Sequence, residues 1–184
     1  ANLQGLRDLD IDDVYVHIDS LLHELPGPLD LFRRWERQQW SAHELDFATD
    51  RQQWNALGPF LQEQLEMIFS GFFVGEQAVT DTLSPILTGA PHEQDRWFLS
   101  TQVADEARHA YFFARFFSEV VHEGDSLGEV MTRAWRWTAS DAYDQVFGSR
   151  GALAEMTDAV RLDPQDPAKW VRAITVYHLM VEGI

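Results

Sequence analysis

The sequence predicts an all-α protein, a helical bundle built around two long antiparallel helices. Apolar residues recur at the three- and four-residue spacing of amphipathic helices over long segments, and the alternating pattern of strands occurs nowhere in the 184 residues. Gly and Pro at 88–91 separate the two longest segments. Because so short a connection makes consecutive helices pack side by side, a helical hairpin is expected at the centre of the fold.

The N-terminal part of the chain is predicted to lead into this hairpin. Residues 1–28 mix short apolar pairs with Asp, Gly and Pro, which favours an irregular or partly helical segment. Apolar residues at helical spacing predict a short helix over 29–40. Residues 40–54 contain several side chains that often cap helices, so this segment is predicted to be a loop before the next helix.

Four further helices are predicted after this loop. The two long ones cover 59–87 and 92–122, a third covers 126–147, and a fourth follows the turn at 163–167 and continues to Ile184. The last helix stops without a cap, a breaker or a polar tail. We therefore expect the chain to be a fragment that lacks C-terminal helices.

Composition excludes several classes of partner. The chain has 14 Lys and Arg against 30 Asp and Glu, a net charge of −16, which repels nucleic acid and anionic membrane surfaces. No segment has the roughly 20 uncharged residues that a membrane span needs. The absence of cysteine leaves carboxylates and imidazoles as the metal ligands. The N-terminus lacks the features of a secretory signal, so a cytoplasmic location is expected.

One Glu-x-x-His step lies in the middle of the second long helix. Residues three apart share a helical face, so Glu106 and His109 can bind one ion or two adjacent ions. A second step, Glu119 and His122, follows 13 residues later, about 20 Å along the helix axis. It cannot share a metal site with the first, and its place at the helix end predicts a solvated terminus.

Two more isolated carboxylates lie in apolar helical segments. Glu76 lies 13 residues before the turn near residue 89, and Glu106 lies 16 residues after residue 90, so an antiparallel hairpin brings them to similar height. Glu182 lies in the last predicted helix. Three carboxylates and the imidazole of His109 are a ligand set suited to iron or manganese. From the residues alone, structural salt bridges remain an equal alternative.

These residues resemble the ferritin-like dimetal-carboxylate superfamily, specifically the ribonucleotide reductase small-subunit group. Within that group, the closest resemblance is to the ligand-binding oxidases related to the small subunit, and it extends over about 40–184. It rests on these segments: Gly75–Thr80, Leu83–Ile86, Asp105–His109, the phenylalanines at 112, 113 and 116, Tyr177 and Val181–Gly183. The resemblance implies a single, incomplete ferritin-like domain over 1–184. Residues 1–40 would be a lead-in segment and short helix, and 41–184 would supply the metal-binding helices.

The resemblance also implies a role for each candidate ligand. Glu76 matches the carboxylate ligand of the first half of the site, Glu106 the bridging carboxylate and His109 the imidazole. Glu182 matches the carboxylate of the second half. A further Glu-x-x-His step is expected beyond Ile184.

Three positions separate the branches of this group. Radical-generating small subunits typically carry a tyrosine where this chain has Phe113. In the ligand-binding oxidases, a valine and a tyrosine at the positions of Val79 and Tyr177 form an ether cross-link. The resemblance therefore implies a manganese/iron or di-iron centre that activates O2. It also implies a long apolar ligand such as a fatty acid, an electron donor that it leaves unidentified, and a homodimer.

Two other functions are compatible with the sequence. One is a radical-initiating small subunit of the manganese/iron type that serves a reductase partner. The other is non-catalytic, either an iron-storage relative of ferritin or a metal-free helical bundle. Of the remaining polar residues, His178 is expected to pack or to support the site rather than bind metal, and Asp46 and Asp50 are expected to be loop and cap residues.

Overall fold

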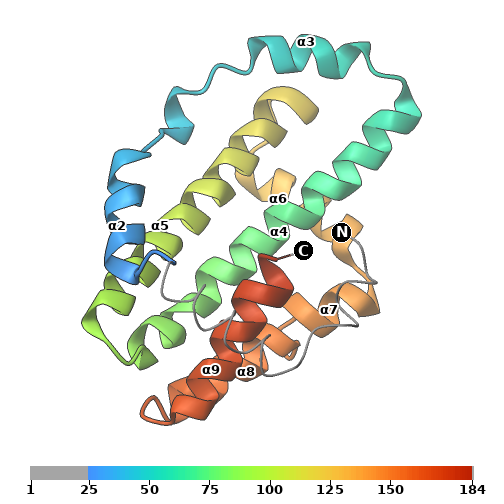
Figure 1. Cartoon of the computed structure of the whole chain (residues 1–184). Helices are drawn as coiled ribbons and strands as arrows, with labels where there is room; N and C mark the ends of the chain where they lie inside the picture. Colours follow the sequence, from blue (N-terminus) through green and yellow to red (C-terminus); the bar gives the residue numbers. More distant parts are fainter. Residues whose placement is uncertain (1–24, 184) are drawn as a thin grey trace, which may run out of the picture.

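The computed structural model describes residues 25–183, and every regular element in this range is helical (Figure 1). The elements in chain order are α2 (Pro28–Arg37), η1 (Ala42–Glu44), α3 (Ala48–Ala56), α4 (Pro59–Gly89), α5 (Glu93–Phe116), η2 (Phe117–Val121), α6 (Leu127–Thr138), α7 (Asp141–Phe147), α8 (Ala152–Leu162), α9 (Pro167–Thr175) and η3 (Val176–Val181). The all-α prediction is confirmed for these residues. Residues 1–24 of the predicted lead-in and the last residue, Ile184, lie outside the described part.

The predicted central hairpin is present. The 31 residues of α4 and the 24 residues of α5 lie antiparallel and pack along their lengths (Figure 1). Pro59 occupies the first turn of α4, where its missing N–H costs no hydrogen bond. The backbone N–H of His92 bonds to Asp95 Oδ2 at 3.2 Å and so fixes the start of α5. After α5 the π-helical turn η2 continues the helix, and Gly124 then reverses the chain with a φ of 93°.

The prediction of a loop at 40–54 was wrong. The short helix η1 and the helix α3 lie there, because Asp46 Oδ1 accepts a hydrogen bond from the N–H of Ala48 at 2.9 Å and starts α3 before the expected caps. Trp54 then buries its side chain in a cluster with Phe47 and Val120. Asp46 was therefore within the predicted loop, but it starts α3, a helix that the sequence did not predict.

The helix predicted over 126–147 is divided into two. It breaks at 139–140, and Ser140 Oγ accepts a hydrogen bond from the N–H of Tyr143 at 3.3 Å to begin α7. Helix α8 was not predicted, and its buried residues Leu153, Thr157 and Val160 face the core. The last predicted helix is confirmed as α9 and η3, which Asp166 caps at its N-terminus.

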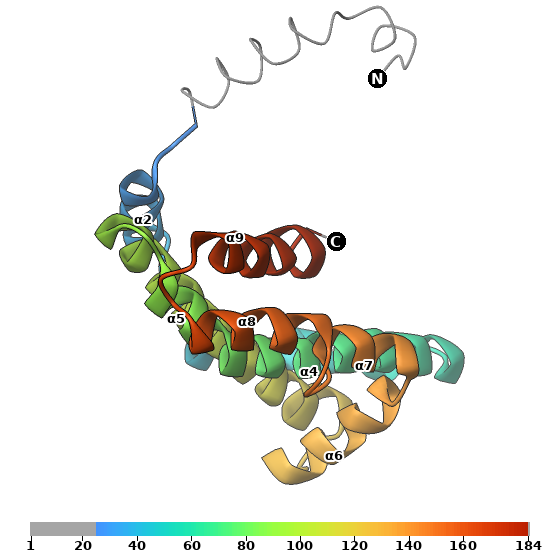
Figure 2. The same cartoon turned by 90° about the horizontal axis from the view of Figure 1, so that it is seen from below.

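Helix α4 is the centre of the packing. Helices α8 and α9 cover its C-terminal half on one side, and α6 packs on another side nearer its N-terminus (Figures 1 and 2). One cluster of buried apolar residues includes Val79, Leu83 and Ile86 of α4, and a second cluster includes Phe73. Glu76 therefore lies between two apolar clusters. None of the described helices is both long enough and apolar enough to span a membrane.

We predict that Gly89→Ala destabilises the fold. A Cβ at this position would lie 2.7 Å from Val160 Cγ1 and 3.1 Å from Trp170 Cδ1, so α8 and α9 must move away from α4. The expected loss is about 1–3 kcal/mol of unfolding free energy, measured by urea denaturation. Gly71→Ala is the matched control in the same helix, because its Cβ would meet nothing within 4 Å. It should be neutral or stabilising by up to about 1 kcal/mol, and an equal loss in both variants would contradict the packing argument.

Candidate metal centre

Three of the four predicted metal ligands converge between α4 and α5. The ligand atoms of Glu76, Glu106 and His109 all lie within 4.8 Å of one another. His109 Nδ1 is 3.4 Å from Glu76 Oε2 and 3.7 Å from Glu106 Oε2. The three-residue spacing places Glu106 and His109 on one face of α5, and the hairpin brings Glu76 opposite them.

Glu106 is the most buried member of this group. Only 4% of the surface of Glu106 is exposed to solvent. The hydroxyl of Tyr177 donates a hydrogen bond to Glu106 Oε1 at 2.7 Å. The other oxygen, Oε2, is buried without a hydrogen-bond partner among the described residues. Leaving such an oxygen without a partner costs about 1–3 kcal/mol or more. A cation between Oε2, Glu76 and His109 would remove this cost, so the donor set fits a metal of the manganese or iron type.

The three side chains alter one another's protonation. Burial raises the pKa of Glu76 to about 7, and the neighbouring Glu106 adds to the increase. Burial also opposes ionisation of Glu106, but the neighbouring His109 and Glu76 and the hydroxyl of Tyr177 outweigh it and lower its pKa. The two carboxylates beside its ring, Glu106 and Glu76, raise the pKa of His109 to about 10. Without metal, the group therefore holds protons that a bound cation must displace.

Glu182 lies close to this group but outside it. It follows η3, much of its side chain is exposed, and it is not among the three residues whose ligand atoms converge. Its pKa is raised, first by partial burial and then by the negative charge of Glu106, so the two carboxylates interact electrostatically. Glu182 would have to approach Glu76 and Glu106 to share a metal with them.

Val79 and Tyr177 lie in the same buried apolar cluster, together with Leu83 and Ile86. Val79 is 2% exposed and Tyr177 is 1% exposed. Burial and the charge of Glu106 raise the pKa of the Tyr177 phenol, which keeps it protonated and able to donate. The π-helical turn η3 carries Tyr177 inward while Leu179 and Met180 remain exposed. Such turns are frequent at functional sites.

Sequence reasoning missed the aromatic contact on His109. The ring of Trp40 stacks on the imidazole, with centroids 6.2 Å apart and 19° between the planes. Arg108 lies over Trp40 at 5.3 Å and over Trp35 at 5.8 Å, and it forms a salt bridge with Asp105 at 2.8 Å. The signal was Arg108 itself, inside the Glu-x-x-His step, but the sequence does not say which aromatic ring it contacts.

Other polar residues do not join the centre. His178 Nε2 pairs with Gln102 Oε1 at 3.0 Å, in agreement with a packing role. In the second Glu-x-x-His step, Glu119 pairs with Arg115, and His122 Nε2 lies 2.8 Å from Glu66 Oε1. The step is separate from the metal centre, as predicted. The prediction of a solvated terminus was wrong for His122, which is partly buried against α4.

Comparison with known proteins identifies similar chains. The family model described as "Ribonucleotide reductase, small chain" matches residues 24–138. An R2-like ligand-binding oxidase from Sulfolobus acidocaldarius is 27% identical with a TM-score of 0.73, over 85% of this chain and 55% of that chain. A variant of an R2-like ligand-binding oxidase with an anaerobically reconstituted Mn/Fe cofactor is 26% identical with a TM-score of 0.72. The match covers 86% of this chain and 55% of that chain. The chain thus spans about 55% of the length of these structures.

We predict that metal binding tightens as the pH rises. Binding needs an ionised Glu76 and a neutral His109, whereas the metal-free protein holds protons on them up to pH values of about 7 and about 10. Each displaced proton should increase the apparent affinity for Mn²⁺ about tenfold per pH unit below these values. Calorimetry in buffers of different ionisation enthalpy measures the proton release.

Glu119→Gln is the control for this prediction. It removes the carboxylate of the second Glu-x-x-His step, outside the converging group, and should bind Mn²⁺ with the same pH dependence as the unaltered protein. An affinity for Mn²⁺ that does not change with pH would contradict the protonation of the centre described above.

Proposed function

The chain belongs to the ribonucleotide reductase small-chain family and has its ferritin-like dimetal-carboxylate fold, and from this we propose that it is an O2-activating oxidase. The observation that carries the proposal is the buried Glu106 Oε2, which has no hydrogen-bond partner among the described residues and lies beside Glu76 and His109. The neighbouring structures that are named oxidases, one of them with a Mn/Fe cofactor, support the same class of reaction.

In this proposal Glu76, Glu106 and His109 hold a manganese/iron or di-iron pair, with Glu182 as a fourth ligand. The metal pair would supply the binding and reduction of O2, which side chains alone cannot perform. Glu106 would offer its Oε2 to the metals, because Tyr177 already donates a hydrogen bond to Oε1 and Oε2 has no hydrogen-bond partner among the described residues. Trp40 stacks on the imidazole of His109.

We further propose that Val79 and Tyr177 form an ether cross-link. A C–O bond would form between Val79 Cβ and Tyr177 Oη as a C–H and an O–H bond break, and O2 would take up the two electrons and two protons. The burial of both residues in one cluster supports this pairing. Glu106 accepts a hydrogen bond from the Tyr177 hydroxyl at 2.7 Å, so it is placed to receive the phenolic proton.

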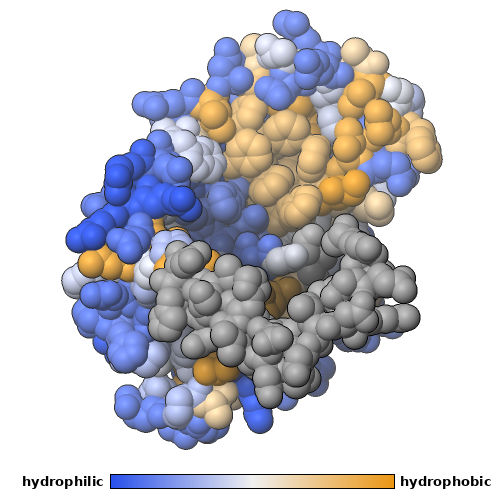
Figure 3. Space-filling model, in the orientation of Figure 1, coloured by the Kyte–Doolittle hydropathy of each residue, from blue (hydrophilic) through white to orange (hydrophobic). Residues whose placement is uncertain are grey.

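The proposed substrate or ligand is a long apolar molecule such as a fatty acid. Leu61, Ile68 and Phe72 are exposed on the face of α4 that leads to Glu76, and Phe72 is 56% exposed although it stacks on Phe113. Figure 3 shows apolar side chains gathered over this part of α4 and α5. A hydrocarbon chain lying along this face would bring its polar end to the metal centre.

A radical-initiating small subunit is the second candidate. The description of the matching family model favours it. Phe113 argues against a tyrosyl radical one turn after His109, because phenylalanine has no phenolic O–H to lose. A reductase partner that binds the protein and gains activity from it would favour this candidate over the oxidase.

The proposal includes a homodimer in the cytoplasm, where manganese and iron are available in the divalent state. Light scattering of the native protein tests the oligomeric state, and cell fractionation tests the location. A monomer over the micromolar range would remove the homodimer without affecting the oxidase.

We predict that the native protein, loaded aerobically with manganese and iron, holds about two metal ions per chain. Elemental analysis after gel filtration measures the content. Glu106→Ala should lose most of the metal, whereas Glu119→Ala, outside the group, should keep it. A metal-free protein in which Glu106→Ala raises the unfolding temperature would overturn the proposal and favour a structural bundle.

We predict that loading with metal and O2 links residues 79 and 177. Mass spectrometry of a digest should find the two peptides joined and lighter by two hydrogen atoms than their sum. Tyr177→Phe should abolish this species, because the phenolic oxygen is missing. Tyr143→Phe should retain it, because the Tyr143 hydroxyl bonds to Gly71 O instead of Glu106. If metal-loaded protein shows only the unlinked peptides, Tyr177 has no cross-linking role.

A further inference from the structure

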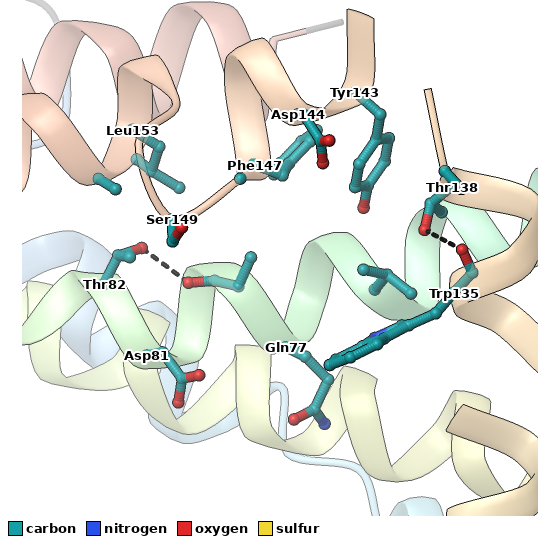
Figure 4. A pocket seen from close by; sticks show the side chains of 15 residues that line it. Gln77, Asp81, Thr82, Trp135, Thr138, Tyr143, Asp144, Phe147, Ser149 and Leu153 are labelled. Carbon is teal, nitrogen blue, oxygen red and sulfur yellow. Dashed lines mark hydrogen bonds between the residues drawn. The ribbon is translucent and has the colours of Figure 1, made fainter. Parts of the chain in front are cut away.

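A separate cavity lies on the face of α4 opposite the metal centre. It has a volume of about 580 Å³, opens to solvent, and is bordered by α4, the end of α6, α7 and the start of α8 (Figure 4). Val74 and Ala78 line it, and each is two residues from Glu76, about 200° around the helix. The cavity is therefore distinct from the metal centre and from the exposed face that carries Phe72.

Three aromatic side chains form part of its wall. Tyr143 and Phe147 come from α7, with ring centroids 4.7 Å apart, and Trp135 comes from α6. The Tyr143 hydroxyl donates to Gly71 O at 2.9 Å, which fixes the ring against α4. Trp135 is 61% exposed, an unusual exposure for so large an apolar side chain. The cavity thus presents aromatic surface, some of it exposed at its mouth.

Two carboxylates flank this aromatic surface. Asp81 comes from α4 and Asp144 from α7, on opposite sides of the cavity (Figure 4). Within residues 25–183 neither carboxylate forms a salt bridge or a side-chain hydrogen bond, and no Lys or Arg lines the cavity. The net charge of −16 adds to the negative potential. An anionic ligand is therefore disfavoured here, which separates this cavity from the fatty-acid site proposed above.

We propose that the cavity binds a small organic cation, an ammonium group carried on an apolar body. Aromatic faces attract cations through their quadrupoles, and the two carboxylates add a direct charge interaction. The apolar part would pack on Val74, Ala78 and Leu153. A volume of about 580 Å³ is in the range of small-molecule sites. This site does not depend on the metal centre or on the proposed oxidase activity.

The test uses three probes of nearly the same shape and different charge. Choline is cationic, 3,3-dimethylbutan-1-ol is neutral and 3,3-dimethylbutanoate is anionic. Ligand-observed NMR titration of the metal-free protein gives the three dissociation constants. We expect choline to bind at least about tenfold more tightly than the alcohol, and the anion not to bind measurably. Equal binding of choline and the alcohol, or no binding of choline, overturns the proposal.

Variants assign the binding to this cavity. The double variant Asp81→Asn with Asp144→Asn should reduce the affinity for choline toward that for the alcohol, because only the attraction of the aromatic faces remains. Glu155→Gln is the control, because this exposed residue lies beside Ala154 but does not line the cavity. It should change the affinity less than about twofold. Choline affinity that survives the double variant, or that falls equally in Glu155→Gln, contradicts the proposed site.

Discussion

The carboxylate of Glu106 is held between elements that are 71 residues apart in the chain, because the hydroxyl of Tyr177 on η3 donates to it across the interior. The second oxygen of Glu106 has no hydrogen-bond partner in the described part of the chain. Burial of this carboxylate is tolerable only with compensating charge nearby, and His109 and a bound cation are the groups that can supply it. The hairpin brings Glu76 and His109 beside this carboxylate, and η3 brings Tyr177 to it.

Helix α4 connects the parts of the molecule because its faces have different environments. The face with Glu76 turns toward α5, and below it Val79 and Leu83 are buried in the cluster that includes α8 and Tyr177. Nearer the N-terminus of α4, the face that carries Glu76 remains exposed at Ile68 and Phe72. The opposite face borders a cavity with aromatic and acidic walls. One helix therefore borders both the proposed metal centre and the proposed cation site.

The helix pattern was predictable where the chain contains long periodic segments. The hairpin was expected because α4 and α5 are long and the break between them contains Gly and Pro. Short elements were harder to predict. Helix α3 has little hydrophobic periodicity of its own, and its start depends on the hydrogen bond to Asp46 and its position on the burial of Trp54. The break before α7 depends on the single hydroxyl of Ser140, which also could have belonged to a continuous helix.

By itself the sequence determined the all-α class, the hairpin, and the identity of Glu76, Glu106 and His109 as a possible metal group. Helical spacing is a local property, and the residues on each side of a short turn are fixed in height by arithmetic. Only the tertiary structure decided that Tyr177 holds Glu106, that Trp40 stacks on His109, and that Glu182 lies beside the group rather than in it. These contacts depend on how distant helices rotate and pack, and that is settled by burial of the whole core rather than by any local pattern.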